Sequence, residues 1–147
     1  MTSSTFAFFG LLVARSAIIA CSEWQSYKMP EIPRLGGWQK HNVSDDAIYE
    51  ELAHFAVSKQ VENRQFYDTV LELVDVEIQV VQGLNYRIKF KTAESTCRVT
   101  DTYSKDLCLP KSREVVKDTC TAVIYDVSWL NRRSVSSFTC EGNAVST

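Results

Sequence analysis

The sequence predicts an α+β fold in which one helix packs across one face of an antiparallel sheet. Two observations carry this prediction: one stretch has helical periodicity, and the stretches after it alternate apolar with polar side chains. The chain has 147 residues, 45% of them hydrophobic and 23% charged, which is an ordinary globular composition. That length has room for one domain, and no repeat or linker divides it.

Residues 1–22 are expected to be a secretory signal peptide, and residues 23–147 the mature domain. An apolar run fills most of the first segment, and Ala20 and Ser22 supply the small side chains for cleavage after Ser22. The segment lacks an early positive charge, and Arg15 interrupts the run. A membrane anchor is the alternative, but the uninterrupted stretch is too short to span a bilayer. We therefore expect a secreted, extracellular protein.

The start of the mature chain is expected to be extended as far as His41. Two prolines exclude a helix there, and the glycine pair at 36–37 gives a flexible joint. Asn42 then begins an Asn-Val-Ser triplet, which is an acceptor sequence for N-glycosylation. Asn42 is therefore a candidate glycosylation site.

One amphipathic helix is predicted from Ser44 to about Val61. Ser44, Asp45 and Asp46 offer capping side chains, and the acidic pair suits the positive end of a helix. Apolar residues then recur at helical spacing, at Ile48, Leu52 and Phe55. This stripe is expected to face the core.

The rest of the chain is predicted to form an antiparallel meander. Strict alternation predicts strands over 69–81 and 84–91, and the glycine-containing turn between them makes a hairpin. Residues 92–113 are predicted to be strand edges and a long loop. A further β-rich run follows at 115–127, and after a turn at 128–131 a strand returns over 134–140.

Five cysteines are present, and Cys21 falls within or at the edge of the predicted leader. An even number remaining in an exported chain implies two disulfides, each stabilising by about 3 kcal/mol. Several pairings are open, and pairing nearest neighbours needs the shortest loops. A metal site is poorly supported, because the sequence has no Cys-x-x-Cys spacing and no histidine near these cysteines. The four are Cys97, Cys108, Cys120 and Cys140.

Composition argues against several classes of function. The net charge is −2, and without Arg15 of the leader it becomes −3, with no basic cluster for nucleic acid or an anionic membrane. The histidines, His41 and His54, have no free thiol to pair with once the disulfides form, and no catalytic or phosphate-binding motif is present. We therefore expect neither an enzyme nor a cofactor.

Three short segments have no evident role in a core: 35–37, 79–83 and Trp129. An aromatic side chain in a turn is a natural binding anchor, although it can equally fold back onto the core. Periodicity does not distinguish these alternatives.

Residues 79–83 read Gln-Val-Val-Gln-Gly, which matches the Gln-x-Val-x-Gly motif of the cystatins. A glycine pair precedes the helix, a tryptophan follows 46 residues after Gly83, and four cysteines lie in the C-terminal part. In this order and spacing, the chain resembles a type 2, secreted cystatin over essentially its whole mature length. The resemblance implies a cystatin-like fold, with one long helix packed across a five-stranded antiparallel sheet. It also implies a monomer with the disulfides Cys97–Cys108 and Cys120–Cys140.

The resemblance implies a reversible, tight-binding, competitive inhibitor of papain-like cysteine proteases, with cathepsin L-like enzymes first among the partners. An N-terminal arm and two hairpin loops would fill the cleft of the protease. The alternative is a cystatin-fold module that binds another protein without inhibiting. The protease-binding residues implied are Leu35, Gly36, Gln79, Val80, Val81, Gln82, Gly83, Ser128 and Trp129.

Three features depart from the family pattern. Ser128 stands where the family usually has proline, so we expect a less restrained loop and a modest loss of affinity. Leu35 directly precedes Gly36, whereas the family arm often has an extra apolar residue between them, which affects register and selectivity. The Ser-Asn-Asp stretch that some members use against legumain is absent from 61–65, so we do not expect legumain inhibition.

Overall fold

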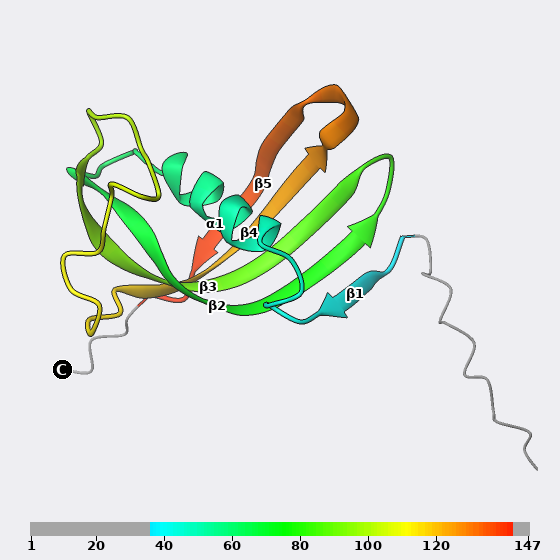
Figure 1. Ribbon diagram of the computed structural model, residues 1–147, viewed down its shortest axis with the longest axis horizontal. Helices are drawn as coiled ribbons and strands as arrows, with labels where there is room; N and C mark the ends of the chain where they lie inside the picture. The colour runs from blue at the N-terminus through cyan, green and yellow to red at the C-terminus, as the bar shows by residue number, and fades with distance from the viewer. Residues whose placement is uncertain (1–35, 143–147) are drawn as a thin grey trace, which may run out of the picture. The chain divides into compact units, whose positions relative to one another are not determined.

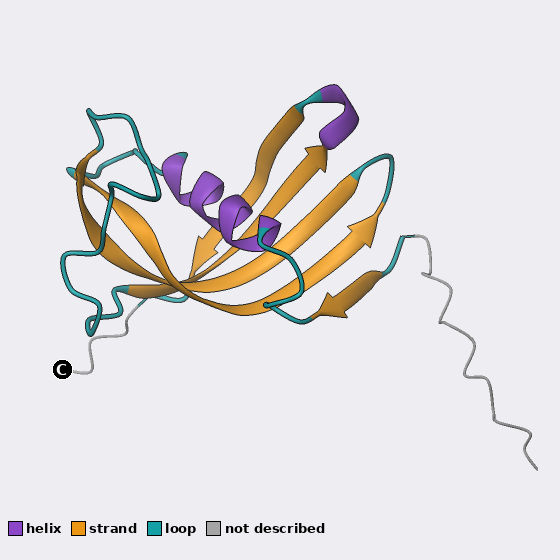
Figure 2. Ribbon diagram, in the orientation of Figure 1, coloured by secondary structure: helices purple, strands orange, loops and turns teal. Residues whose placement is uncertain are grey.

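The computed structural model describes residues 36–142. The predicted leader with Cys21, and the arm residue Leu35, lie outside the described residues. Figure 1 traces the described elements along the chain, and Figure 2 distinguishes helix, strand and loop. In order they are β1 (Trp38–His41), α1 (Ile48–Ser58), β2 (Phe66–Val80), β3 (Leu84–Arg98), β4 (Asp118–Val127), the 3-10 turn η1 (Ser128–Leu130) and β5 (Arg132–Cys140).

The strands form one antiparallel sheet of five strands in the order β1-β2-β3-β4-β5. Each strand pairs with the next along the chain, and α1 lies in the connection between β1 and β2. The predicted fold class, one helix across an antiparallel meander, is therefore confirmed. No helix within residues 36–142 is both long enough and apolar enough to cross a membrane.

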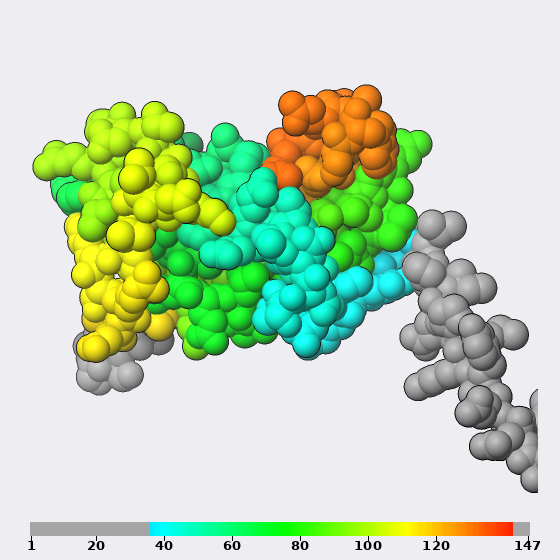
Figure 3. Space-filling view, viewed as in Figure 1, coloured from blue at the N-terminus to red at the C-terminus, as the bar shows by residue number. Residues whose placement is uncertain are grey.

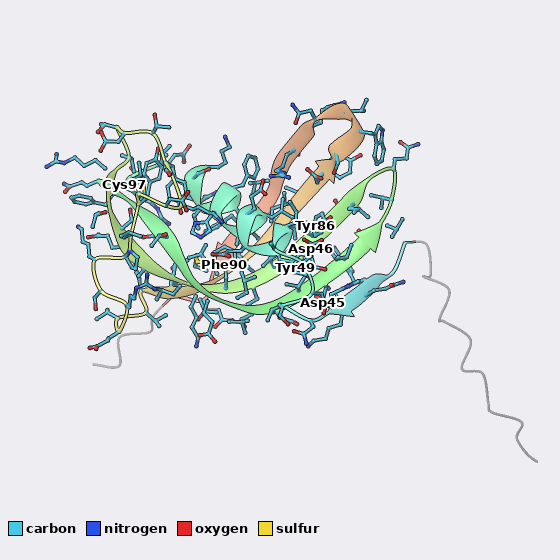
Figure 4. All side chains as sticks on the ribbon, viewed as in Figure 1. Asp45, Asp46, Tyr49, Tyr86, Phe90 and Cys97 are labelled. Carbon is cyan, nitrogen blue, oxygen red and sulfur yellow. A yellow bond between two sulfur atoms is a disulfide. The ribbon has the colours of Figure 1, made fainter. Side chains whose placement is uncertain are left out.

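The core lies between α1 and the concave face of the sheet. Figure 4 labels Tyr49 of the helix and Tyr86 and Phe90 of β3, and the rings of Tyr49 and Tyr86 lie with their centres 6.2 Å apart. Leu52 and Phe90 have no solvent exposure, and burial of each such side chain contributes about 1.5–3 kcal/mol. Other buried apolar members of this cluster are Ala53, Ala56, Val57, Val76, Ile88, Ala122 and Ile124. The predicted helix stripe is thus part of the core, with Ile48 and Phe55 partly buried against it.

Helix α1 is shorter than predicted at both ends, since it begins at Ile48 rather than Ser44 and ends at Ser58. Asp45 forms a turn instead of a helix, because its carboxylate accepts the N–H of Asn42 at 3.0 Å. The Asp46 carboxylate accepts the N–H of Ile48 at 2.9 Å, from one position before the N-cap residue Ala47, whose own side chain makes no capping hydrogen bond. The sequence predicted acidic side chains at this end of the helix, but not the turn that precedes it.

Strands β2 and β3 are longer than predicted, at 15 residues each: β2 begins at Phe66 rather than Thr69, and β3 ends at Arg98 rather than Lys91. Alternation fades after Lys91 because Thr92 and Ser95 are polar yet fully buried, and the Thr92 hydroxyl donates to the Asp118 carbonyl at 3.3 Å. Register shifts in β2 bend the sheet around the helix. At the C-terminal side, β4 begins at Asp118 rather than Val115, and β5 begins at Arg132 rather than at residue 134.

Both disulfides lie at the end of the sheet away from the β2–β3 turn. Cys97–Cys108 fastens the loop after β3, and Cys120–Cys140 joins the start of β4 to the end of β5. This is the pairing that the resemblance implies. Asp118 lies close to the second pair, but disulfide sulfurs are not thiolate ligands, so this cluster is not a metal site.

Candidate functional site

The antiparallel meander brings three segments together at one end of the strands. Gly36 precedes β1, residues 79–83 contain the β2–β3 turn, and residues 128–131 connect β4 to β5. Because neighbouring strands run in opposite directions, these three segments all lie at the same end, as Figure 1 shows. We call this set of residues the hairpin edge.

Gln79 joins the arm to the first hairpin. Its side-chain nitrogen donates to the Gly36 carbonyl at 2.9 Å, and its oxygen accepts from the Asn85 amide at 2.9 Å. The Gly36 N–H also donates to the Val80 carbonyl at 3.3 Å. Gly36 has a φ of +86°, but a Cβ there would meet no atom within 4 Å. Backbone conformation, rather than lack of space, therefore favours glycine at this position.

The first hairpin turns tightly and presents an apolar side chain. The Val81 N–H donates to the Gly83 carbonyl at 3.0 Å, and the Val81 side chain remains 42% exposed. Gly83 is buried against the second hairpin: a Cβ there would lie 2.8 Å from the Asp126 carbonyl oxygen and 2.9 Å from Val127 Cγ2. Close approach of the two hairpins is therefore the reason for glycine at position 83.

A further contact joins the hairpins. The Tyr125 hydroxyl on β4 donates to the Gln82 carbonyl at 3.2 Å. Together with the packing of Gly83, this contact makes the two hairpins neighbours in one continuous surface. The orange tip of the second hairpin lies beside the green of the first in the space-filling view of Figure 3.

The second hairpin holds Trp129 away from the core. Ser128–Leu130 form η1, and Asn131 closes the turn with a φ of +49° and an N–H that donates to the Ser128 carbonyl at 3.1 Å. Trp129 is 71% exposed and Leu130 56% exposed. Trp129 is therefore exposed at the turn and does not fold back onto the core.

Beneath η1 lies a buried carboxylate that the sequence analysis did not identify. Asp126 is 5% exposed; it accepts from the Ser128 hydroxyl and, at 2.9 Å, from Arg133 Nε. Arg133 Nη1 in turn donates to Glu51 of α1 at 2.9 Å. Burial acts to raise the pKa of Asp126, but the bonds from Ser128 and Arg133 outweigh burial, so this pKa lies below its usual range.

These groups were missed because they come from distant parts of the sequence. Glu51 and Arg133 are 82 positions apart, and no local pattern links them. The one available signal was Asp126 itself, a charged residue in the apolar run that ends at Val127.

Of the protease-binding residues that the resemblance implies, all except Leu35 are described and lie at the hairpin edge. Leu35 is outside the described residues. Asn42 follows the other end of β1, whose last residue His41 pairs with Val76 in the middle of β2. The candidate glycosylation site is thus separate from the hairpin edge.

One helix across a five-stranded meander, with a glycine-containing arm and two joined hairpins at one edge, defines a cystatin-type protein. The chain belongs to the cystatin family: the family model for the cystatin domain matches residues 36–129. Cystatins inhibit cysteine proteases and are not enzymes, so the expectation of a non-enzyme is confirmed by family membership.

Similar proteins are found among ticks. Mialostatin of Ixodes ricinus is 47% identical over 109 residues, covering 73% of this chain and 76% of mialostatin. Cystatin-2 of Ornithodoros moubata is 46% identical over 107 residues, covering 72% of this chain and 82% of that protein. Salivary cystatin-L2 of Ixodes scapularis is 42% identical over 113 residues, covering 75% and 84%.

Solved cystatin structures share the fold. The salivary cystatin of Ornithodoros moubata superposes with a TM-score of 0.69 at 44% identity, covering 74% of this chain and 99% of that one. Mialostatin, described as a gut cystatin, gives 0.69 at 46% identity, covering 72% and 98%. Dimeric human cystatin F gives 0.64 at 21% identity, covering 83% and 96%, which supports the fold alone.

Proposed function

We propose that this chain is a reversible, tight-binding, competitive inhibitor of papain-like cysteine proteases, with cathepsin L-like enzymes as its targets. The observation that carries the proposal is the joining of three segments into one edge that exposes Val81 and Trp129. Loops fixed in this way lose little conformational entropy on docking, which favours tight binding by an interface of ordinary size.

Each segment has a distinct part in the proposed inhibition. Leu35 on the arm would occupy a non-primed substrate pocket, and Gly36 would turn the backbone away before a peptide bond reaches the catalytic thiolate. The φ of +86° at Gly36 supports such a change of direction. With no scissile bond presented, the protease would bind the chain without cutting it.

The hairpins would supply the contacts to the rest of the cleft. Val81 would make an apolar contact, with Val80 and Gln82 beside it in the same loop. Trp129 would anchor the chain on the primed side, since a large exposed aromatic side chain has the properties of a binding hot spot. Gln79 and Gly83 would act indirectly, by holding the loops in place.

The test is the inhibition constant of residues 23–147 against papain and cathepsin L, with legumain measured alongside. Nanomolar inhibition of the first two without legumain inhibition is expected. Trp129→Ala should weaken inhibition at least about tenfold, as loss of an aromatic anchor does. Leu107→Ala is the matched control, because Leu107 is also apolar and 74% exposed but lies in the loop at the other end of the sheet. No inhibition below micromolar concentrations would instead favour a binding module with another partner.

We also propose that the protein is secreted after removal of residues 1–22, and that it is monomeric and glycosylated at Asn42. Asn42 is exposed, and its side-chain oxygen Oδ1 accepts the Ser44 hydroxyl at 3.0 Å. A glycan attaches to the amide nitrogen, which this bond does not use. A loss of mass on treatment of the secreted protein with an N-glycosidase, abolished in Asn42→Gln, tests the modification; an unchanged mass argues against it.

A further inference from the structure

We propose that the Ser128 hydroxyl, held by the Asp126 carboxylate, positions Trp129 for protease binding and so replaces the proline usual in the family. The inference rests on the proposed inhibitory function and assigns positioning roles to Ser128, Asp126 and Arg133. It replaces the expectation that serine leaves this loop less restrained.

Ser128 is held at two points. This residue begins η1 directly before Trp129, and its hydroxyl donates to Asp126 Oδ2 two residues earlier. Its carbonyl accepts the Asn131 N–H at 3.1 Å on the other side of the turn. Side chain and main chain together therefore fix the residue that precedes the exposed tryptophan.

The carboxylate that holds Ser128 is itself fixed in the sheet. Asp126 is 5% exposed, and its two oxygens have different partners, Ser128 at Oδ2 and Arg133 at Oδ1. Asp126 and Arg133 are also opposite each other in the β4–β5 register. The anchor is thus part of the sheet rather than part of the loop.

Arg133 connects this carboxylate to the helix. Arg133 Nη1 donates to Glu51 at 2.9 Å, and the Arg133 guanidinium lies 5.7 Å from the centre of the Phe55 ring. A chain of contacts therefore runs from α1 through Arg133 and Asp126 to the hydroxyl beside Trp129. A proline restrains such a turn covalently through φ, whereas here a charge-assisted hydrogen bond has that role.

The decisive comparison uses Ser128→Thr and Ser128→Val, which have nearly the same shape and differ in the hydroxyl. Inhibition of cathepsin L and the dissociation rate are measured for both, with Ser128→Ala as a third variant. We expect Thr to remain within about threefold of wild type, and Val and Ala to lose about tenfold, mainly through faster dissociation. Ser136→Ala, at an exposed serine of β5, is the control and should change nothing.

A double-mutant cycle separates positioning from direct contact. If Ser128 acts through Trp129, then Ser128→Ala should cause no further loss in a Trp129→Ala background. The same tenfold loss in both backgrounds would overturn the inference. Equal inhibition by the Thr and Val variants would also overturn it.

A readout without protease keeps this inference distinct from the proposed function. The indole N–H of Trp129 can be followed by its ¹H–¹⁵N heteronuclear NOE, assigned through Trp129→Phe. The NOE should fall in the Val variant and stay at the wild-type value in the Thr variant. If the wild-type chain fails to inhibit but this difference is present, the proposed function fails and the positioning of Trp129 stands. If the chain inhibits and the NOE is equal in both variants, the inference fails alone.

Discussion

The side-chain amide of Gln79 donates a hydrogen bond to the Gly36 carbonyl at 2.9 Å, which links the arm before β1 to the end of β2. Gln79 reaches Gly36 from a separation of 43 positions, and Asn85 fixes the amide from its other side. Gln79, the first residue of the Gln-x-Val-x-Gly motif, therefore joins the arm at Gly36 to the first hairpin.

Gln79→Glu should weaken inhibition roughly tenfold, because glutamate cannot donate to the Gly36 carbonyl and places an acceptor against it. The loss should appear chiefly in the dissociation rate of the protease complex. Gln65→Glu, an exposed change of the same kind outside the hairpin edge, is the control. Equal inhibition by both variants would mean that the arm does not depend on this bond.

Gly83→Ala should destabilise the domain by about 1–3 kcal/mol, because the new Cβ would lie 2.8 Å from the Asp126 carbonyl oxygen. Urea unfolding measures this loss. Gly36→Ala provides the comparison: its Cβ meets nothing within 4 Å, so only the positive φ is penalised, by about 1 kcal/mol. A smaller loss at Gly83 than at Gly36 would contradict the close approach of the hairpins.

Acidification should reduce stability through His54. This side chain is 8% exposed and contacts the Tyr103 hydroxyl at 2.6 Å; burial lowers its pKa below 6.5, although Glu50 opposes the shift. As the pH falls, the unfolded chain protonates His54 before the folded chain does. The contribution of neutral His54 to stability is therefore fully present above about pH 6.5 and is lost as the pH drops toward the lower pKa of the folded state.

The measurement is the free energy of unfolding at several pH values between about 7.5 and 5. His54→Gln should flatten the dependence below about pH 6.5, where the unfolded chain takes up the His54 proton. Gln65→Asn, a change between exposed side chains that do not titrate, should retain the wild-type dependence. A flat profile for the wild-type protein would show that His54 takes up its proton equally well when folded.

Asp68→Asn should cost about 3 kcal/mol, since the Asp68 side chain is only 6% exposed and is paired with both Arg64 and Lys117. Asp75→Asn is the matched control at a more exposed pair: the Asp75 side chain is 34% exposed and lies 3.2 Å from Lys40, which is 75% exposed, and pairs near the surface contribute less than about 1 kcal/mol. Thermal unfolding distinguishes the two. A comparable small loss in both would show that water, rather than the ion pair, satisfies Asp68.

Periodicity was sufficient for the helix, the central hairpin and the order of strands β2 to β5, whereas the segment that forms β1 was predicted only to be extended. It did not predict the ends of the elements, because single side chains determine them. The bond from the Asn42 N–H to Asp45 forms a turn before the helix begins, and Thr92, which is polar but buried, interrupts the alternating pattern within β3. The hairpin edge could be predicted from the motif and from Trp129. Its support could not, because Asp126 and Glu51 meet only through Arg133 in the folded chain.

The contact of Gly83 with the end of β4 has a consequence for the redesign of inhibitors. A loop exchange that transplants residues 79–83 alone would place a foreign turn against Asp126 and Val127, where there is no room for a side chain. Selectivity should therefore transfer between scaffolds only as a cassette that carries the first hairpin together with residues 125–133. The two loops therefore have to be exchanged together. In a library that varies one loop and keeps the other constant, we expect most variants to have hairpins that do not fit against each other.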